Sequence, residues 1–240
     1  MDILALDTSQ AACSAALWRE RAGERRVISR YEERSIGHAE ALMPLVRDLL
    51  AEAGLAVADL DALAVTVGPG TFSGVRIALS AARGMALVAG LPVIGVTSLE
   101  AVAAGLDGAH EPEDAVRVAC FDARRGEVYV QAFTLGLAPL TAPSLLKLAD
   151  AAASLPGSEL VLVGTGAGLL FETLKSHSPP GIETVRLGVA PPFPHAEKIA
   201  EIAARRMAEP GFKADTAPMP GPLYIRAPDA KLPTSRAPLS

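Results

Sequence analysis

The chain has 240 residues and a mass of 24.8 kDa, a length that suits one or two domains. Half of its residues are hydrophobic, only 20% are charged and the mean hydropathy is +0.31, so the composition excludes a disordered or coiled-coil chain. The 22 lysines and arginines against 27 acidic residues give a net charge of −5. This sign excludes a surface that binds nucleic acid by phosphate neutralisation alone, so any role near RNA would need a basic partner.

Neither a membrane span nor a secretory signal is expected. A transmembrane helix needs about 18 or more apolar residues in a row, and the best candidate runs, 84–99 and 128–146, are interrupted by glycine, proline or polar residues. The first residues include Asp2 and Asp7, where a secretory signal has a basic stretch followed by an apolar one. We therefore expect a cytoplasmic protein.

The first half of the chain predicts a β-hairpin, a third strand, and then alternating helices and strands. Apolar runs at 3–7 and 12–18 flank a polar turn and form the hairpin. Apolar residues at spacings of three and four over His38–Ala53 predict an amphipathic helix that ends at Gly54 and is bent by Pro44. The remaining expected elements are strands over 26–32, 63–67 and 92–96, and helices over 75–89 and 98–106.

The second half repeats this order. Strands are expected over 115–121, 127–135 and 160–163, and helices over 144–154, from about 168 to 175, and over 195–208. A lobe that opens with a hairpin differs from a doubly wound sheet, which opens with a βαβ unit, so the pattern predicts an α/β fold of two ribonuclease-H-like lobes. The expected parts are an N-terminal lobe over 1–106, a boundary at 107–114, a C-terminal lobe over 115–190, a terminal helix over 191–209 that belongs to either lobe, and a Pro-rich tail over 210–240.

Two carboxylates end equivalent strands of the predicted lobes. Asp7 and Asp122 are both expected to face the cleft between the lobes, where folds of this kind hold a nucleotide and carboxylates hold Mg²⁺. Alternatively each carboxylate caps the turn that follows it, which we favour because these turns lack the glycine that a phosphate contact requires. The candidate residues of a vestigial nucleotide cleft are Asp7, Ser9, Asp122, Gly164 and Gly166.

The glycine-rich loop at 68–74 lacks the features of a phosphate-binding loop. A P-loop places Lys and then Ser or Thr after its last glycine, whereas Val75 and Arg76 follow Gly74, and the loop is too long for a dinucleotide fingerprint. We therefore favour a structural turn. The second glycine-rich turn, 164–168, could admit a nucleotide base, although such turns are common between strands and helices.

No catalytic or metal-binding residue is predicted. The histidines form no pair at helical spacing, no cysteine lies near them, and no GxSxG nucleophile elbow occurs. Cys13 and Cys120 lie far apart in apolar runs, so we expect buried free thiols rather than a disulfide or a metal pair.

The predicted helix over 74–89 is the most informative segment. Small residues recur at every fourth position: Gly74, Ala78, Ala82 and Ala86. The apolar arc around them is much wider than one helix face, so the helix must be covered on two sides. Its own sheet supplies one cover, and either the helix over His38–Ala53 or another protein supplies the second. Both possibilities stay open on the pattern alone.

Six segments, in order along nearly the whole chain, together resemble the bacterial TsaB (YeaZ) family. They are ILALDTS at 3–9, GPGTFSGVRI at 68–77, GMAL at 84–87, VIGVTSL at 93–99, DARRGEVY at 122–129 and PLYIR at 222–226. Each segment is modest, but the set is specific, above all DARRGEVY and the late PLYIR.

The resemblance implies an actin-like ATPase (ASKHA) fold, in agreement with the two predicted lobes. It also implies a dimerisation or scaffold subunit that acts with a catalytic paralogue, TsaD, and an ATPase, TsaE. Together they make N6-threonylcarbamoyladenosine at position 37 of tRNAs that read codons beginning with adenine. The chain would have no cofactor of its own, ATP and Mg²⁺ being used by the complex, and would meet tRNA only through the complex. The paralogue's metal is held by two histidines four apart, whereas here the corresponding helix has His38 alone and position 42 is Leu42.

The resemblance also suggests a partner surface on the helices over His38–Ala53 and 74–89, used by a homodimer when the protein is alone and by TsaD in the complex. The wide apolar arc of the second helix supports this surface independently. The predicted interface residues are His38, Ala41, Leu42, Leu45, Gly74, Ala78 and Ala82.

Two enzymatic alternatives stay open. An ASKHA-type, ATP-dependent phosphotransferase would use Asp7 and Asp122 at a Mg-nucleotide, and a metallopeptidase-like hydrolase would need a metal or nucleophile that the sequence does not offer. A stand-alone RNA-binding protein is disfavoured by the acidic balance.

Overall fold

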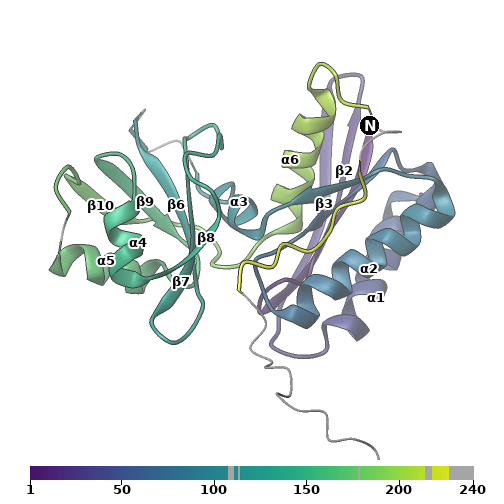
Figure 1. Cartoon of the computed structure of the whole chain (residues 1–240). Coiled ribbons are helices and arrows are strands. Elements are labelled where there is room, and N and C mark those ends of the chain that lie inside the picture. The colour runs from purple at the N-terminus through teal and green to yellow at the C-terminus, as the bar shows by residue number, and fades with distance from the viewer. Residues whose placement is uncertain (108–110, 113, 178, 214–217, 227–240) are drawn as a thin grey trace, which may run out of the picture.

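The computed structural model describes residues 1–107, 111–112, 114–177, 179–213 and 218–226, arranged as two lobes side by side (Figure 1). The first lobe is built on a five-stranded sheet with the order β3-β2-β1-β4-β5. Its strands are β1 (Asp2–Asp7), β2 (Ala12–Arg21), β3 (Glu24–Glu33), β4 (Ala62–Thr66) and β5 (Val93–Val96). The first three strands pair antiparallel, whereas β4 and β5 run parallel to β1.

The second sheet repeats this topology with the order β8-β7-β6-β9-β10. Its strands are β6 (Val116–Asp122), β7 (Glu127–Phe133), β8 (Ser144–Lys147), β9 (Glu159–Val163) and β10 (Thr184–Leu187). Here β6 takes the place of β1, with antiparallel β7 and β8 on one side and parallel β9 and β10 on the other. The predicted α/β fold of two ribonuclease-H-like lobes is confirmed.

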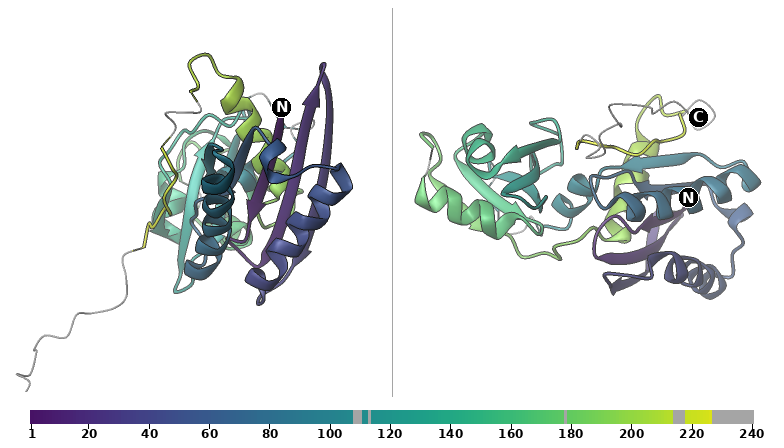
Figure 2. Two further views of the ribbon diagram at one scale, coloured as in Figure 1. Left: turned by 90° about the vertical axis from the view of Figure 1, so that its right-hand side faces the viewer. Right: turned by 60° about the horizontal axis from the view of Figure 1, so that its bottom comes forward.

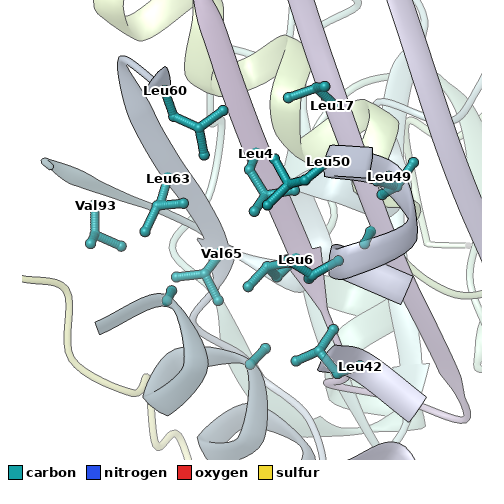
Figure 3. Packing of buried hydrophobic residues seen from close by; sticks show 14 of the residues in the cluster. Leu4, Leu6, Leu17, Leu42, Leu49, Leu50, Leu60, Leu63, Val65 and Val93 are labelled. Atoms are coloured by element: carbon teal, nitrogen blue, oxygen red, sulfur yellow. The ribbon is translucent and has the colours of Figure 1, made fainter. Parts of the chain in front are cut away.

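One face of the first sheet is covered by α1 (His38–Ala53) and α2 (Phe72–Ala89), which also contact each other (Figures 1 and 2). Alternate residues of a strand point to opposite faces, so Leu4 and Leu6 of β1 point toward these helices. Figure 3 shows Leu4 beside Leu50 of α1 and Leu6 beside Leu42 of α1. This cluster is the largest hydrophobic core of the protein and holds α1 and α2 in place.

The remaining faces are covered by helices from both halves of the chain. The opposite face of the first sheet packs against α6 (Ala196–Ala208), and the second sheet is covered by α3 (Ser98–Ala103) on one face. The other face of the second sheet packs against α4 (Leu148–Ser154) and α5 (Ala167–Ser176). In the first lobe, a short 3-10 helix, η1 (Val57–Asp59), follows α1. Because α3 follows the first sheet in sequence but packs on the second, and α6 does the reverse, these two helices join the lobes.

Several elements differ from the sequence-based expectation. The predicted helix over 144–154 is β8 followed by α4, because Leu145 and Leu146 pair with β7 instead of continuing a helical turn. The short edge strand β10 was not predicted, and α2 begins at Phe72 because the Thr71 side chain caps it by accepting from the Gly74 N–H at 3.1 Å. α1 runs continuously through Pro44.

Parts of the predicted domain division lie outside the described residues. These are 108–110 and 113 of the predicted boundary, and 214–217 and 227–240 of the predicted Pro-rich tail. The described parts of the tail, 210–213 and 218–226, form no helix or strand. The terminal helix, for which either lobe was open, packs on the first sheet as α6.

Among the residues that the structure describes, one helix, α2, is long and apolar enough by length and composition to cross a membrane, contrary to the expectation that no segment is. The expectation counted unbroken apolar runs, whereas α2 reaches the required hydropathy despite Arg76 and Arg83. Core helices of folded domains share this composition. In the structure α2 packs as such a helix, with Ala78, Leu79 and Ala82 in the main hydrophobic core.

Candidate functional site

A cleft of about 520 Å³ lies between the lobes and is lined from both sides. The first lobe contributes Gln10 and Ala11 of the β1–β2 turn and Gly70 and Thr71 of the loop before α2. The second lobe contributes Phe121, Asp122, Ala123, Arg124, Tyr129 and Thr165. The segment before α6 adds Phe193. Of the predicted cleft residues, only Asp122 lines this space.

Asp7 does not face the cleft, contrary to one expectation from the sequence. Its carboxylate is completely buried, and Oδ1 accepts hydrogen bonds from the Ser9 N–H at 3.1 Å, the Ser9 hydroxyl at 2.6 Å and the Thr66 hydroxyl. All of β1 is buried because helices cover both faces of its sheet. The favoured alternative, in which Asp7 caps the turn that follows it, is confirmed.

Burial changes the acidity of this carboxyl group. Loss of solvation raises the pKa of Asp7 to about 6, although the hydrogen bonds from Ser9 and Thr66 act in the opposite direction. Oδ2 has no hydrogen-bond partner among the residues that the structure describes. Asp7 is therefore a buried carboxyl group that is held by Ser9 and Thr66 and does not reach the cleft.

The glycine-rich loop at 68–74 packs directly on the backbone of the β1–β2 turn. A Cβ atom on Gly74 would lie 2.1 Å from the carbonyl oxygen of Thr8, and one on Gly70 would lie 2.3 Å from that of Ser9. The Thr71 N–H donates to the Ser9 carbonyl at 2.8 Å, and the Thr8 hydroxyl donates to the Gly74 carbonyl at 2.6 Å. The glycines serve this close backbone contact, which is the structural interpretation favoured from the sequence.

The second lobe repeats the contact at the equivalent place. A Cβ on Gly164 would lie 2.4 Å from the carbonyl oxygen of Cys120, and the Gly166 N–H donates to the same oxygen at 2.9 Å. Gly164 and Gly166, the candidates for admitting a nucleotide base, therefore contact the backbone at the end of β6 instead. Asp122 caps its own turn, accepting from the Arg124 N–H at 2.8 Å and pairing with the Arg124 guanidinium at 3.3 Å.

The structure buries four of the seven predicted interface residues. Leu42, Gly74, Ala78 and Ala82 are buried inside the chain, and His38, Ala41 and Leu45 are partly buried. The small-residue stripe of α2 faces the sheet and α1 because only small side chains fit between Thr8, β1 and the neighbouring helix. The sequence left open whether α1 or another protein covers α2. The small-residue stripe is covered within the chain, by the sheet and α1.

The exposed apolar residues of α1 and α2 lie on their outward faces. Leu87 is 85% exposed and Val88 90% exposed at the end of α2, and Met43 and Phe72 are also exposed. A shallow apolar hollow of about 300 Å³ lies at the C-terminal end of α2, against η1, and is lined by Val57, Ala58, Gly84, Met85, Val88 and Ala89. In the sequence, this exposed surface of α2 corresponds to the part of its apolar arc that lies opposite the stripe of Gly74, Ala78 and Ala82.

The protein therefore consists of two ribonuclease-H-like lobes around a cleft, and the carboxylates at the ends of β1 and β6 cap the turns that follow them. Within the described part of the chain, no group of three or more His, Cys, Asp or Glu residues is arranged to hold a metal ion. Both cysteines are buried and free, as predicted.

Comparison with known proteins places the chain among close relatives. A family model described as TsaD, tRNA N6-adenosine threonylcarbamoyltransferase, matches residues 31–214. The chain is 44% identical over 130 residues to the tRNA threonylcarbamoyladenosine biosynthesis protein TsaB of Escherichia coli and 38% identical over 129 residues to that of Bacillus subtilis. Each of these matches covers 54% of this chain and 53% of the relative, so the chain spans about half the length of these curated relatives.

The solved structure of YeaZ from Pseudomonas aeruginosa matches nearly the whole fold. It superposes with a TM-score of 0.74 at 33% identity, covering 93% of this chain and 99% of that one. The chain belongs to the TsaB/YeaZ family.

Two glycines of α2 provide a matched test of the loop packing. Gly74→Ala should destabilise the fold by about 2 kcal/mol or more, because its Cβ would overlap the Thr8 carbonyl. Gly84→Ala should stabilise it by about 0.5–1 kcal/mol, because Gly84 is exposed inside the helix with nothing within 4 Å of its missing Cβ. Urea unfolding of both variants measures the difference, and equal stabilities would contradict the backbone contact.

The raised pKa of Asp7 predicts a specific pH dependence. Between its ordinary value of 3.8 and about 6, the native state binds this proton and the unfolded state does not, so the free energy of unfolding falls as pH rises. The contribution is about 3 kcal/mol across this window. Asp7→Asn removes it, so wild type should lose stability relative to the variant between pH 4 and 6 in denaturant unfolding. Parallel stability curves for the two proteins would show that Asp7 does not titrate there.

Proposed function

We propose that this chain is a non-catalytic, TsaB-type subunit of the machinery that forms N6-threonylcarbamoyladenosine at position 37 of tRNAs reading codons that begin with adenine. In this proposal it acts in the cytoplasm as a scaffold beside a TsaD-type catalytic subunit and a TsaE-type ATPase. The curated relatives named TsaB support the pathway. The observation that carries the non-catalytic role is the complete burial of Asp7.

The position of Asp7 matters because of the chemistry that the cleft would otherwise perform. A phosphotransferase of this architecture needs carboxylates directed into the cleft to hold Mg²⁺ against the phosphates. Here the first such carboxylate is enclosed by Ser9 and Thr66, and the second, Asp122, is paired with Arg124. These contacts favour a subunit that works through its surfaces over a phosphotransferase.

The partner surface that we propose is the outward face of α1 and α2. It centres on the exposed residues Met43, Leu87 and Val88 and the adjacent apolar hollow. Large apolar side chains exposed beside an apolar hollow are typical of a protein interface. The same face would serve a homodimer of the isolated chain and the TsaD-type subunit in the complex, with tRNA bound only through the complex because the chain itself is acidic.

The pathway is tested by tRNA composition. Cells depleted of this protein should lose N6-threonylcarbamoyladenosine from total tRNA, and restoring the chain should return it, as measured by mass spectrometry of nucleosides. In parallel, the purified chain alone should neither hydrolyse ATP nor retain free tRNA on a filter at physiological salt. Unchanged modification on depletion, or a Mg²⁺-dependent ATPase lost in Asp7→Ala, would contradict the proposal.

The partner surface is tested by charge substitution. Leu87→Glu and Val88→Glu should each weaken both the homodimer and the complex with the TsaD-type subunit by about tenfold or more, because an unpaired carboxylate would be buried on assembly. Leu169→Glu is the matched control, since Leu169 is an exposed leucine of α5 on the other lobe.

Analytical ultracentrifugation and titration calorimetry measure these affinities, with thermal melts to confirm folding. Assembly that tolerates both α2 substitutions as well as the α5 control would place the partner surface elsewhere.

A further inference from the structure

Residues 218–226 of the C-terminal tail run along the first lobe and reach the junction between the lobes; we call this segment the strap (yellow in Figure 1). It is held against the end of β4 by the Leu223 N–H, which donates to the Val67 carbonyl at 2.7 Å. A Cβ on Gly95 would lie 2.9 Å from the Pro220 side chain, so the glycine of β5 permits this close approach. The strap is therefore packed on the first lobe although it forms no regular structure.

Two arginines of α2 fix the strap further. Arg83 Nη2 donates to the Pro220 carbonyl at 2.6 Å, and Arg76 Nε donates to the Tyr224 hydroxyl at 2.8 Å. The Tyr224 ring stacks on Phe72 with a centroid separation of 5.8 Å, and the Arg76 guanidinium lies 3.6 Å from the Phe72 centroid. Since α2 contains no acidic residue, its arginines have no carboxylate on their own helix that would compete for these contacts.

The last residue of the strap reaches the other lobe. Arg226 Nη2 donates to the Ala123 carbonyl at 2.9 Å and to Glu127 Oε2 at 2.8 Å. Both acceptors belong to the β6–β7 hairpin, and Ala123 lines the cleft opposite Thr71. The late PLYIR segment and the DARRGEVY segment, which lie almost a hundred residues apart in the sequence, are thus joined at the edge of the cleft.

The other junction between the lobes is made by α3 and α6. Arg206 of α6 binds both carboxylate oxygens of Glu100, at 2.7 and 2.8 Å, and also donates to the Gly95 carbonyl at 2.6 Å. The strap adds a second connection, made by Arg226, at the cleft itself. Two lobes that are joined by helices and share a cleft are the usual arrangement for a hinged opening.

We propose that the strap is a latch that holds the two lobes at a fixed separation across the cleft, with Arg226 as its anchor on the second lobe and Arg76 and Arg83 as its anchors on α2. Release of either end frees the β6–β7 hairpin to move away from Thr71. Arg226 and Glu127 are about a quarter and a third exposed, so their attraction is partly screened by solvent and weakens with added salt. The latch is independent of the pathway in which the protein acts.

Distance measurement between the lobes tests the latch in the full-length chain. Spin labels on Arg47→Cys of α1 and Glu172→Cys of α5 report the lobe separation, since both sites are exposed and the native Cys13 and Cys120 are fully buried. Arg226→Ala should broaden the distance distribution and shift its mean by several ångströms. Arg76→Ala should produce a smaller shift, because the Leu223 N–H and Arg83 still hold the strap on the first lobe.

Graded and matched variants separate a latch from a general loss of stability. Glu127→Gln keeps the bond to the Ala123 carbonyl, so its shift should be smaller than that of Arg226→Ala, and added salt should shift wild type but not this variant. Arg30→Ala is the control, because Arg30 also bonds one carbonyl and one carboxylate, those of Ser29 and Glu52, but within one lobe.

Thermal melts establish that each variant is folded. A distribution for folded Arg226→Ala that matches Arg30→Ala overturns the latch. If Arg226→Ala does not fold, an unchanged distribution for Glu127→Gln with an unchanged salt response overturns it equally.

Discussion

A repeated backbone contact determines how both lobes are assembled. In the first lobe, the segment after β4 packs directly on the backbone at the end of β1. In the second lobe, the segment after β9 packs in the same way on the end of β6. Gly74 lies against Thr8 in the first lobe, and Gly164 lies against Cys120 in the second. No side chain can intervene at these points, so the strand end, the loop and the following helix are placed as one unit. The positions of α2 and α5, and both walls of the cleft, follow from this contact.

The same contact keeps the carboxylate of Asp7 out of the cleft. The turn after β1 is pressed against the glycine loop, and its carboxylate is used to hold Ser9 and Thr66 instead of a ligand. What α2 retains for interaction is its outward face, with exposed apolar residues at its C-terminal end and the strap beside its two arginines. In this chain the carboxylate at the end of β1 is therefore used inside the fold, and the exposed groups of α2 lie on its outward face.

Much of the architecture could be predicted from periodicity and turn residues, because these are local signals. The helix over His38–Ala53 has the predicted bounds, and the hairpin that opens each lobe is present. The strand β8 was mistaken for helix because the pairing of Leu145 and Leu146 with β7 overrides local preference, and β10 is too short for a periodic signal. At the site, the capping role of Asp7 was predictable from its place before a turn. Its complete burial was not, since that depends on helices from both ends of the chain.

The duplicated fold, the buried thiols, the structural role of the glycine loop and the family could all be predicted without the structure, because each depends on residue types at short spacing. Which part of the wide apolar arc of α2 is core and which is surface depends instead on how the helices pack in three dimensions. Periodicity measures the width of an apolar arc but not the direction from which neighbours cover it. Thr8, β1 and α1 cover the stripe of Gly74, Ala78 and Ala82, which leaves Leu87 and Val88 exposed. The joining of Arg226 to Glu127 was likewise undecided, because contacts between distant segments depend on how the chain returns to the cleft after α6.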